Sequence, residues 1–260
     1  RGAAAALRSR TECAPTMGSE MSSQPPPSRI KGRGSASNAE GRFESTVVET
    51  YDDGWYRDDG EAAAPPATTV TEETARTIIS RNDSPDIPFD QSLNPYRGCE
   101  HGCVYCYARP THSYLNLSAG LDFETRLTAK TNTAERLRAE LGKRGYVVSP
   151  INLGANTDPY QPIERKYRLT RQVLEILAET RHPATIVTKS ANVLRDLDLL
   201  APMARERLVQ VFVSVTTLDN QLASRLEPRA SAPHRRLQAI GELAAAGVPV
   251  GVFVAPLIPM

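Results

Sequence analysis

The chain has 260 residues, of which 40% are hydrophobic, and a formal net charge of +1. This length accommodates one sizeable domain and a tail, and the near-zero charge gives no overall attraction to nucleic acid or to an anionic membrane. No apolar run approaches the roughly 20 residues that span a bilayer, and the first residues lack the continuous hydrophobic stretch of a secretory signal. The sequence therefore predicts a cytoplasmic protein without a membrane partner.

The N-terminal part of the chain, residues 1–75, is poor in large aliphatic side chains and rich in Pro, Ser, Gly and Ala. Such a segment cannot bury enough apolar surface to offset the conformational entropy that is lost on folding. We expect a disordered N-terminal tail over residues 1–75 and a folded domain over residues 76–260. The chain ends at Met260, soon after the apolar residues 248–255, so we expect this domain to be incomplete at its C-terminus.

Short β-rich segments alternate with amphipathic helical segments from Ser92 onward. This alternation predicts βα units around a parallel sheet, which is an α/β fold. The nearly continuous apolar run at residues 208–215 is typical of a strand that is covered on both faces. The predicted strands are residues 92–97, 151–155, 184–188, 208–215 and 248–255.

Each gap between predicted strands contains a helical pattern that starts at a residue able to cap a helix. Pro202 is expected to interrupt the third of these helices. Pro233 suits the first turn of the fourth helix, and Gly247 suits its end. The expected capping residues are Thr133, Thr170, Asn192 and Ser231.

The most informative segment is the short loop after the first predicted strand. It contains Cys99, Cys103 and Cys106, which are three of the four cysteines in the chain. Thiolates select soft metal centres such as zinc, cuprous copper and iron-sulfur clusters. A structural tetrahedral site usually has four protein ligands, whereas a cubane cluster held by three cysteines leaves one iron free. A zinc site of the three cysteines with His101 or His112 is the alternative.

Polar motifs follow the other predicted strands. In parallel α/β folds, ligands bind at the carboxyl ends of the strands, where loops and helix N-termini present polar groups. We therefore expect these motifs to lie near the three cysteines. They are residues 155–160, 188–190, 214–217 and 255–259.

The spacing CxxxCxxC, with Tyr105 just before the third cysteine, resembles the cluster-binding loop of radical S-adenosylmethionine (SAM) enzymes. The order of the polar motifs, together with Leu-Glu-Pro-Arg at residues 226–229, resembles the spore photoproduct lyase branch of that superfamily. The resemblance extends from residue 92 to residue 260. It implies a partial parallel (β/α) barrel of the radical SAM type, truncated here after about the fifth strand.

The resemblance also implies the cofactors and partners. A 4Fe-4S cluster is expected on Cys99, Cys103 and Cys106, with its free iron chelated by SAM. In the superfamily an electron from the cluster cleaves SAM, and the resulting 5'-deoxyadenosyl radical takes hydrogen from a substrate. A reducing electron donor such as flavodoxin or ferredoxin is the implied protein partner, and the substrate stays open.

Matched position by position, the resemblance implies five cofactor contacts. Thr157 and Asp158 are expected near the methionine amino group of SAM, Lys189 and Ser214 near its carboxylate, and Tyr105 near its adenine. The charges agree, because an ammonium group is a compact partner for a carboxylate and a carboxylate suits an amine.

One position departs from the lyase branch. Spore photoproduct lyases have a hydrogen-donating cysteine in the turn after the second strand, and Ala155 occupies the matching position here. Alanine cannot return a hydrogen atom to a product radical, so lyase-like repair of nucleic acid is kept as an alternative function. A non-catalytic zinc or iron-sulfur protein is the other alternative. Glu227 and Arg229 are interpreted as a structural ion pair without a catalytic role.

Overall fold

The structure is a computed structural model that describes residues 30–38 and 67–257. Its centre is a six-stranded sheet with the strand order β2-β3-β6-β7-β8-β9. The strands from β3 to β9 run parallel, and β2 runs antiparallel to β3, which confirms the predicted parallel α/β arrangement. The strand bounds are β2 Ile79–Arg81, β3 Gln91–Leu93, β6 Ile151–Leu153, β7 Ala184–Thr188, β8 Val209–Ser214 and β9 Val250–Phe253.

The longer helices of the described residues pack along this sheet. They are α2 Thr133–Leu141, α4 Leu169–Glu179, α5 Leu197–Arg205 and α7 Pro233–Ala245. α2 packs against α4 and α4 against α5, while α7 contacts β8 and β9. Burial of apolar side chains between helices and sheet is the main favourable term in folding. The core includes Leu93, Leu153, Val173, Leu174, Ile186, Leu200, Val211 and Leu243.

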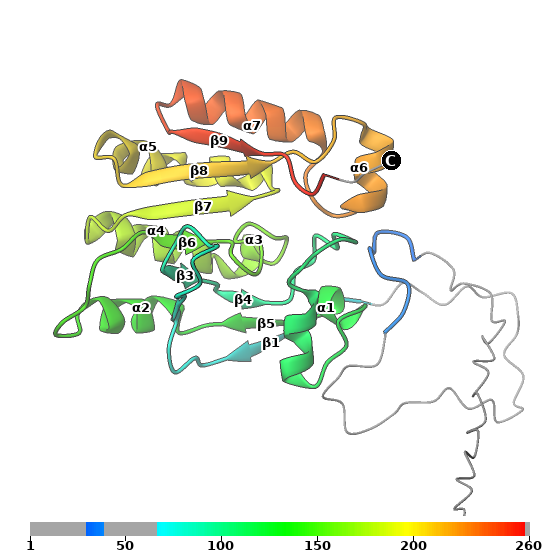
Figure 1. The fold of residues 1–260 in the computed structure, drawn as a ribbon, viewed down its shortest axis with the longest axis horizontal. Coiled ribbons are helices and arrows are strands. Elements are labelled where there is room, and N and C mark those ends of the chain that lie inside the picture. Colours follow the sequence, from blue (N-terminus) through cyan, green and yellow to red (C-terminus); the bar gives the residue numbers. More distant parts are fainter. Residues whose placement is uncertain (1–29, 39–66, 258–260) are drawn as a thin grey trace, which may run out of the picture.

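Shorter helical segments lie at the carboxyl ends of the parallel strands. α1, α3 and α6 lie on the side toward which the arrowheads of β7 and β8 point (Figure 1). This is the edge where loops of parallel α/β proteins bind ligands. The bounds are α1 Asp122–Thr125, α3 Glu164–Tyr167 and α6 Asn220–Leu226, with 3-10 helices η1 Arg109–Leu115 and η2 Ala191–Asp196.

A second sheet has the strand order β1-β5-β4, with β1 Thr69–Glu73, β5 Arg126–Lys130 and β4 Tyr96–Arg97. The prediction of one strand over residues 92–97 is therefore wrong, because this segment divides into β3 and β4, which belong to different sheets. Pro95 between them has no backbone N–H to donate to a ladder. The side chain of Asn94 instead accepts from the backbone N–H groups of Asn156 and Thr157, at 3.0 and 3.2 Å.

Two pieces of the predicted tail are folded, so the boundary at residue 75 is too late. One piece is β1, and the other is the segment 30–38, drawn in blue near α1 in Figure 1. Arg33 is 5% exposed and donates from Nη1 to the Glu124 carbonyl at 3.0 Å. The N–H groups of Gly34 and Ser35 donate to the Glu124 carboxylate, both at 3.0 Å. Such polar contacts need no aliphatic side chains, so composition does not reveal them. Residues 1–29 and 39–66 of the predicted tail lie outside the described residues.

The predicted helix caps are wrong by one or two positions, because the observed N-caps are Asn132, Arg168, Ser190 and Ala232. For α4, the cap comes from α3: the Glu164 carboxylate accepts from the N–H groups of Thr170 and Arg171, at 3.0 and 3.4 Å. An acidic group at a helix N-terminus also interacts favourably with the helix dipole. Pro202 lies inside α5, and the break between η2 and α5 comes before it.

The membrane prediction concerns helix length and polarity. None of the helices within residues 30–38 and 67–257 combines the length and the apolar character needed to cross a bilayer.

Arg33→Ala tests whether segment 30–38 is part of the fold. Loss of this guanidinium leaves the buried Glu124 carbonyl without its donor, so we expect the free energy of unfolding to fall by about 1–3 kcal/mol in equilibrium urea unfolding. Lys31→Ala, at an exposed position of the same segment, is the control and should change stability by less than about 0.5 kcal/mol. Equal effects of the two substitutions would contradict docking of the segment.

Candidate functional site

Residues 99–106, between β4 and η1, are called the cysteine loop below. Cys99 and Cys103 are each 8% exposed, Cys106 is half-buried, and all three are free thiols. The Cys99 N–H donates to the Phe123 carbonyl at 2.9 Å, and the Cys106 N–H donates to the Cys103 carbonyl at 3.2 Å. The three predicted ligands therefore belong to one folded and largely buried turn.

Glu124 and Arg109 hold the middle of the cysteine loop. Glu124 is fully buried and pairs with Arg109, which donates from Nε and Nη2 to the Cys103 carbonyl at 3.1 and 3.0 Å. Gly102 has a φ of +65°, and a Cβ at this position would lie 2.8 Å from Glu124 Oε2. The loop can therefore close over this ion pair because residue 102 is glycine.

Gln161 holds the start of the loop. This side chain is fully buried, donates to the Gly98 carbonyl at 3.1 Å and accepts from the Glu100 N–H at 3.0 Å. Sequence analysis did not single out Gln161, nor the pair of Arg109 and Glu124. A lone Gln, Arg or Glu has no characteristic spacing, and Gln161 is 63 residues from Gly98 in the chain. Only burial together with distant partners reveals their role.

Asp158 joins the cysteine loop to the end of β7. Its carboxylate accepts from Thr188 Oγ1 and the Lys189 N–H, both at 2.7 Å, and from the Tyr160 N–H at 2.9 Å. His101 Nδ1 of the loop lies 3.2 Å from Asp158 Oδ2. Burial alone would raise the pKa of Asp158, but His101 and these hydrogen bonds outweigh it and lower the pKa to about 2. The Asp158 carboxylate is thus anionic and connects the cysteine loop to the end of β7. Its contact with the SAM amino group stays a prediction.

The buried environment of Cys99 and Cys103 disfavours the free thiolate form. Burial raises the pKa of Cys103 to about 12, and nearby Lys189 opposes this shift only in part. Burial and the negative charge of Asp158 also raise the pKa of Cys99, and the nearby backbone of Asp158 and His101 lowers it only in part. Protonated thiols are poor nucleophiles, whereas a metal centre displaces their protons and binds the thiolates. Binding of a metal centre by these cysteines would therefore release their protons.

Lys189 and Tyr105 face each other beside the loop. Lys189 Nζ lies 5.7 Å from the centroid of the Tyr105 ring. None of the ion pairs among the described residues includes Lys189. The Tyr105 hydroxyl donates to Glu227 and lies 3.1 Å from Thr216 Oγ1. An ammonium group without a carboxylate partner suits the anionic group of a ligand, as predicted for the SAM carboxylate.

Thr157 and Ser214 lie at the same edge of the sheet. Thr157 is 2% exposed, and its Oγ1 donates to the Tyr96 carbonyl at 3.3 Å. Ser214 is the last residue of β8 and is 4% exposed, and its carbonyl accepts from Arg236 Nη1 at 3.0 Å. The hydrogen bonds of both residues thus run to protein groups, and their contacts with SAM stay predictions.

The predicted ion pair between Glu227 and Arg229 is wrong. Glu227 pairs with Arg236 of α7, and both side chains are buried. Arg229 instead lies 3.1 Å from Glu100 of the cysteine loop. Closeness in sequence therefore does not decide the partner of either side chain.

The predicted metal types place different demands on the loop. Within the described ranges, no three or more His, Cys, Asp or Glu side chains are grouped as the ligands of one metal ion would be. A cubane cluster requires a wider arrangement, because each thiolate binds its own iron. Both histidines of the zinc alternative have other contacts: His101 with Asp158, and His112 Nε2 with the Arg126 carbonyl at 2.9 Å. The His101 contact uses Nδ1 and leaves Nε2 as a candidate metal ligand, so these contacts do not separate a cubane from a zinc ion.

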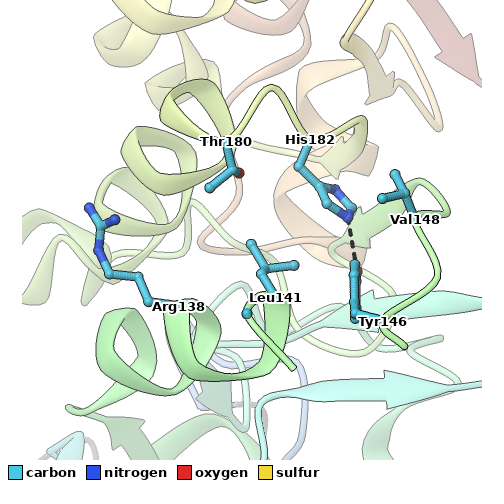
Figure 2. Close-up of a pocket in the computed structure, with 7 residues that line it drawn as sticks. Arg138, Leu141, Tyr146, Val148, Thr180 and His182 are labelled. Carbon is cyan, nitrogen blue, oxygen red and sulfur yellow. Dashed lines mark hydrogen bonds between the residues drawn. The ribbon is translucent and has the colours of Figure 1, made fainter. Parts of the chain in front are cut away.

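Two cavities lie at opposite edges of the sheet. One, of about 290 Å³, lies at the amino end, where Tyr146 precedes β6 and His182 precedes β7. Figure 2 shows these two side chains pointing toward each other, with the Tyr146 hydroxyl 2.8 Å from His182 Nε2. The other, of about 380 Å³, adjoins the cysteine loop and is lined in part by His101 and Arg229. In parallel α/β folds the carboxyl edge carries function, so the second cavity adjoins the candidate site.

Comparisons with known proteins give one family model and several uncharacterised relatives. The family model described as the radical SAM superfamily matches residues 93–260. An uncharacterised protein of Mycobacterium tuberculosis is 42% identical over 173 residues, which cover 66% of this chain and 51% of that protein. An uncharacterised protein of Methanocaldococcus jannaschii is 28% identical over 167 residues, which cover 64% of this chain and 60% of that protein. The chain thus spans only about half to three fifths of the length of these relatives.

Solved structures show the same fold. Spore photoproduct lyase complexed with dinucleoside spore photoproduct matches with a TM-score of 0.53 at 19% identity, over 74% of this chain and 52% of that chain. A mutant of this lyase with bound AdoMet and dinucleoside spore photoproduct gives 0.52 at 20% identity, over 72% and 51%. This likeness confirms the predicted radical SAM-like fold, over about half of the lyase's length. Because the family model covers more than half of the sequence, including the cysteine loop, the chain belongs to the radical SAM superfamily.

Proposed function

We propose that this chain is a radical SAM enzyme that binds a 4Fe-4S cluster through Cys99, Cys103 and Cys106, binds SAM beside it, and acts on a substrate still to be identified. One observation carries the proposal: Asp158 Oδ2 lies 3.2 Å from His101 Nδ1 and Lys189 Nζ lies 5.7 Å from the Tyr105 ring, so two predicted SAM contacts adjoin the loop that carries the predicted ligands. When bound, the two groups supply the superfamily's chemistry, in which an electron from the cluster cleaves SAM to a 5'-deoxyadenosyl radical that takes hydrogen from a substrate.

The chain's own residues bind and orient these groups. The thiols give up their protons on binding, and the nearby backbone of His101 and Asp158 favours the charged form of Cys99. Lys189 offers a charge-assisted hydrogen bond to the SAM carboxylate, and its contact with the Tyr105 ring orients the ammonium group. An electron carrier of the flavodoxin or ferredoxin type is the proposed reductant.

A nucleic-acid lesion is the second candidate substrate. It is favoured by the structural likeness to a lyase complexed with dinucleoside spore photoproduct. The net charge of +1 opposes it, as does Ala155, whose carbonyl accepts from the Tyr107 hydroxyl and whose side chain offers no thiol. Binding of a single-stranded oligonucleotide separates the two cases. An affinity that falls steeply with salt supports a nucleic-acid substrate, and no binding at low salt removes it.

Removal of one ligand tests the cluster. After anaerobic reconstitution with iron and sulfide, we expect the wild-type chain to hold about four irons and, once reduced, to form 5'-deoxyadenosine from SAM. Cys106→Ala should lose most of this iron and all of this product, as measured by metal analysis and chromatography. Cys13→Ala, which removes the cysteine outside the loop, is the control and should match the wild type. A loaded cluster that never forms the product would contradict the enzyme, and stoichiometric zinc without iron would favour the zinc alternative.

Lys189→Gln tests the carboxylate contact. Loss of a charge-assisted hydrogen bond costs about 1.5–3 kcal/mol, so we expect SAM to bind roughly 10- to 100-fold more weakly. The iron content should not change, because Lys189 is not a ligand. Binding is measured from the change that SAM causes in the paramagnetic-resonance spectrum of the reduced cluster. Lys166→Gln, at an exposed position of α3, is the control. Unchanged SAM affinity in Lys189→Gln would remove this residue from the site.

A further inference from the structure

Residues 226–229, at the end of α6 and the start of the connection to α7, lie along the cysteine loop and are called the brace below. The Val104 N–H donates to the Leu226 carbonyl at 2.9 Å, and the Arg229 N–H donates to the His101 carbonyl at 3.2 Å. These two backbone contacts lie on either side of the second cysteine in the loop. The brace therefore holds the loop from the side of α6 and α7, far along the chain from the cysteines.

Glu227 is the buried centre of the brace. It is 3% exposed, and its Oε1 accepts from the Tyr105 hydroxyl and from Thr216 Oγ1 at 2.7 Å. Its Oε2 accepts from Arg236, which is 1% exposed and also donates to the Ser214 carbonyl at 3.0 Å. A buried ion pair is tolerated only when its other hydrogen-bonding atoms are satisfied, and this one is bonded on both sides. Its geometry is therefore closely determined.

This network reaches the side of the loop where SAM is proposed to bind. Tyr105 lies between Cys103 and Cys106, and its ring centroid is 5.7 Å from Lys189 Nζ. Tyr105 is 122 residues from Glu227 in the chain, so the contact joins two separate parts of the fold. Movement of the Glu227 carboxylate would therefore displace the turn between Cys103 and Cys106. It would also displace the Tyr105 ring, which contacts the Lys189 ammonium group.

We propose that Glu227 is a positioning residue of the radical SAM site: paired with Arg236, it holds Tyr105, and with it the turn from Cys103 to Cys106, in the arrangement that the cluster and SAM require. The inference rests on the proposed function and deepens it, because it concerns the same site. Residues that orient ligand-bearing groups typically change metal affinity or activity by about 10- to 100-fold when they are mutated.

Tyr105→Phe, Glu227→Gln and the double variant form a mutant cycle. Phenylalanine keeps the ring and removes the hydroxyl donor, whereas glutamine keeps the size of Glu227 and removes its charge. We expect each single variant to retain its fold by circular dichroism but to bind SAM about 10-fold more weakly, judged from the SAM-induced change in the spectrum of the reduced cluster. The double variant should lose no more SAM affinity than the weaker-binding single variant, because both substitutions disrupt the same contact between Tyr105 and Glu227.

Glu179→Gln is the matched control, because it breaks the exposed pair with Arg138 at the opposite edge and should leave iron content and SAM binding unchanged. Wild-type SAM affinity in Tyr105→Phe and Glu227→Gln would overturn the inference. It would also be overturned if the fold-losses of SAM affinity in the two single variants multiplied in the double variant. If Glu227→Gln does not fold, Tyr105→Phe decides alone: about a 10-fold loss supports the inference, and wild-type affinity overturns it. A wild-type chain that takes up no iron would instead overturn the proposed function, and the inference with it.

Discussion

Several charged side chains are buried at the carboxyl ends of the strands of the main sheet. The geometry of the cysteine loop depends on the ion pairs and hydrogen bonds that these side chains make. Glu124 pairs with Arg109 beneath the loop, and Asp158 binds His101 and the end of β7. Glu227 pairs with Arg236. An unpaired charge at such depth would cost several kcal/mol, so each pairing allows little movement. The loop is therefore held by electrostatic contacts to three separate parts of the fold.

The parallel sheet explains why these parts meet. Thr188 at the end of β7 is in register with Val213 of β8, and Ser214 at the end of β8 is in register with Phe253 of β9. Residues that follow such strands emerge side by side at one edge, whatever their separation in sequence. Asp158, after β6, can thus accept from the backbone of Lys189, after β7. The resulting site combines buried thiols, an anionic link and a cation without a carboxylate partner in the described residues.

Sequence patterns predicted the regular part of the fold well. The strand expected at residues 184–188 is β7 to the residue, and β6, β8 and β9 lie within their predicted ranges. β6, β7 and β8 are short apolar runs largely buried in the core, which is the signal that hydrophobic patterns carry best, whereas β9 is partly exposed. The failures have a different origin. β1 and segment 30–38 are held by backbone and polar contacts, and α4 is capped by Glu164 from α3, so apolar patterning and local capping rules do not detect them.

The sequence by itself determined the three candidate ligands, the α/β class and the superfamily, because ligand spacing and the alternation of strands and helices are local properties of the chain. Tertiary structure alone decided which charged side chain pairs with which. Glu227 binds Tyr105 and Arg236 rather than Arg229, and Gln161 bonds on both sides of Cys99, through Gly98 and Glu100. Such pairings depend on which groups are buried together when distant segments pack. Burial makes a partner necessary, and only the folded chain determines which partner is within reach.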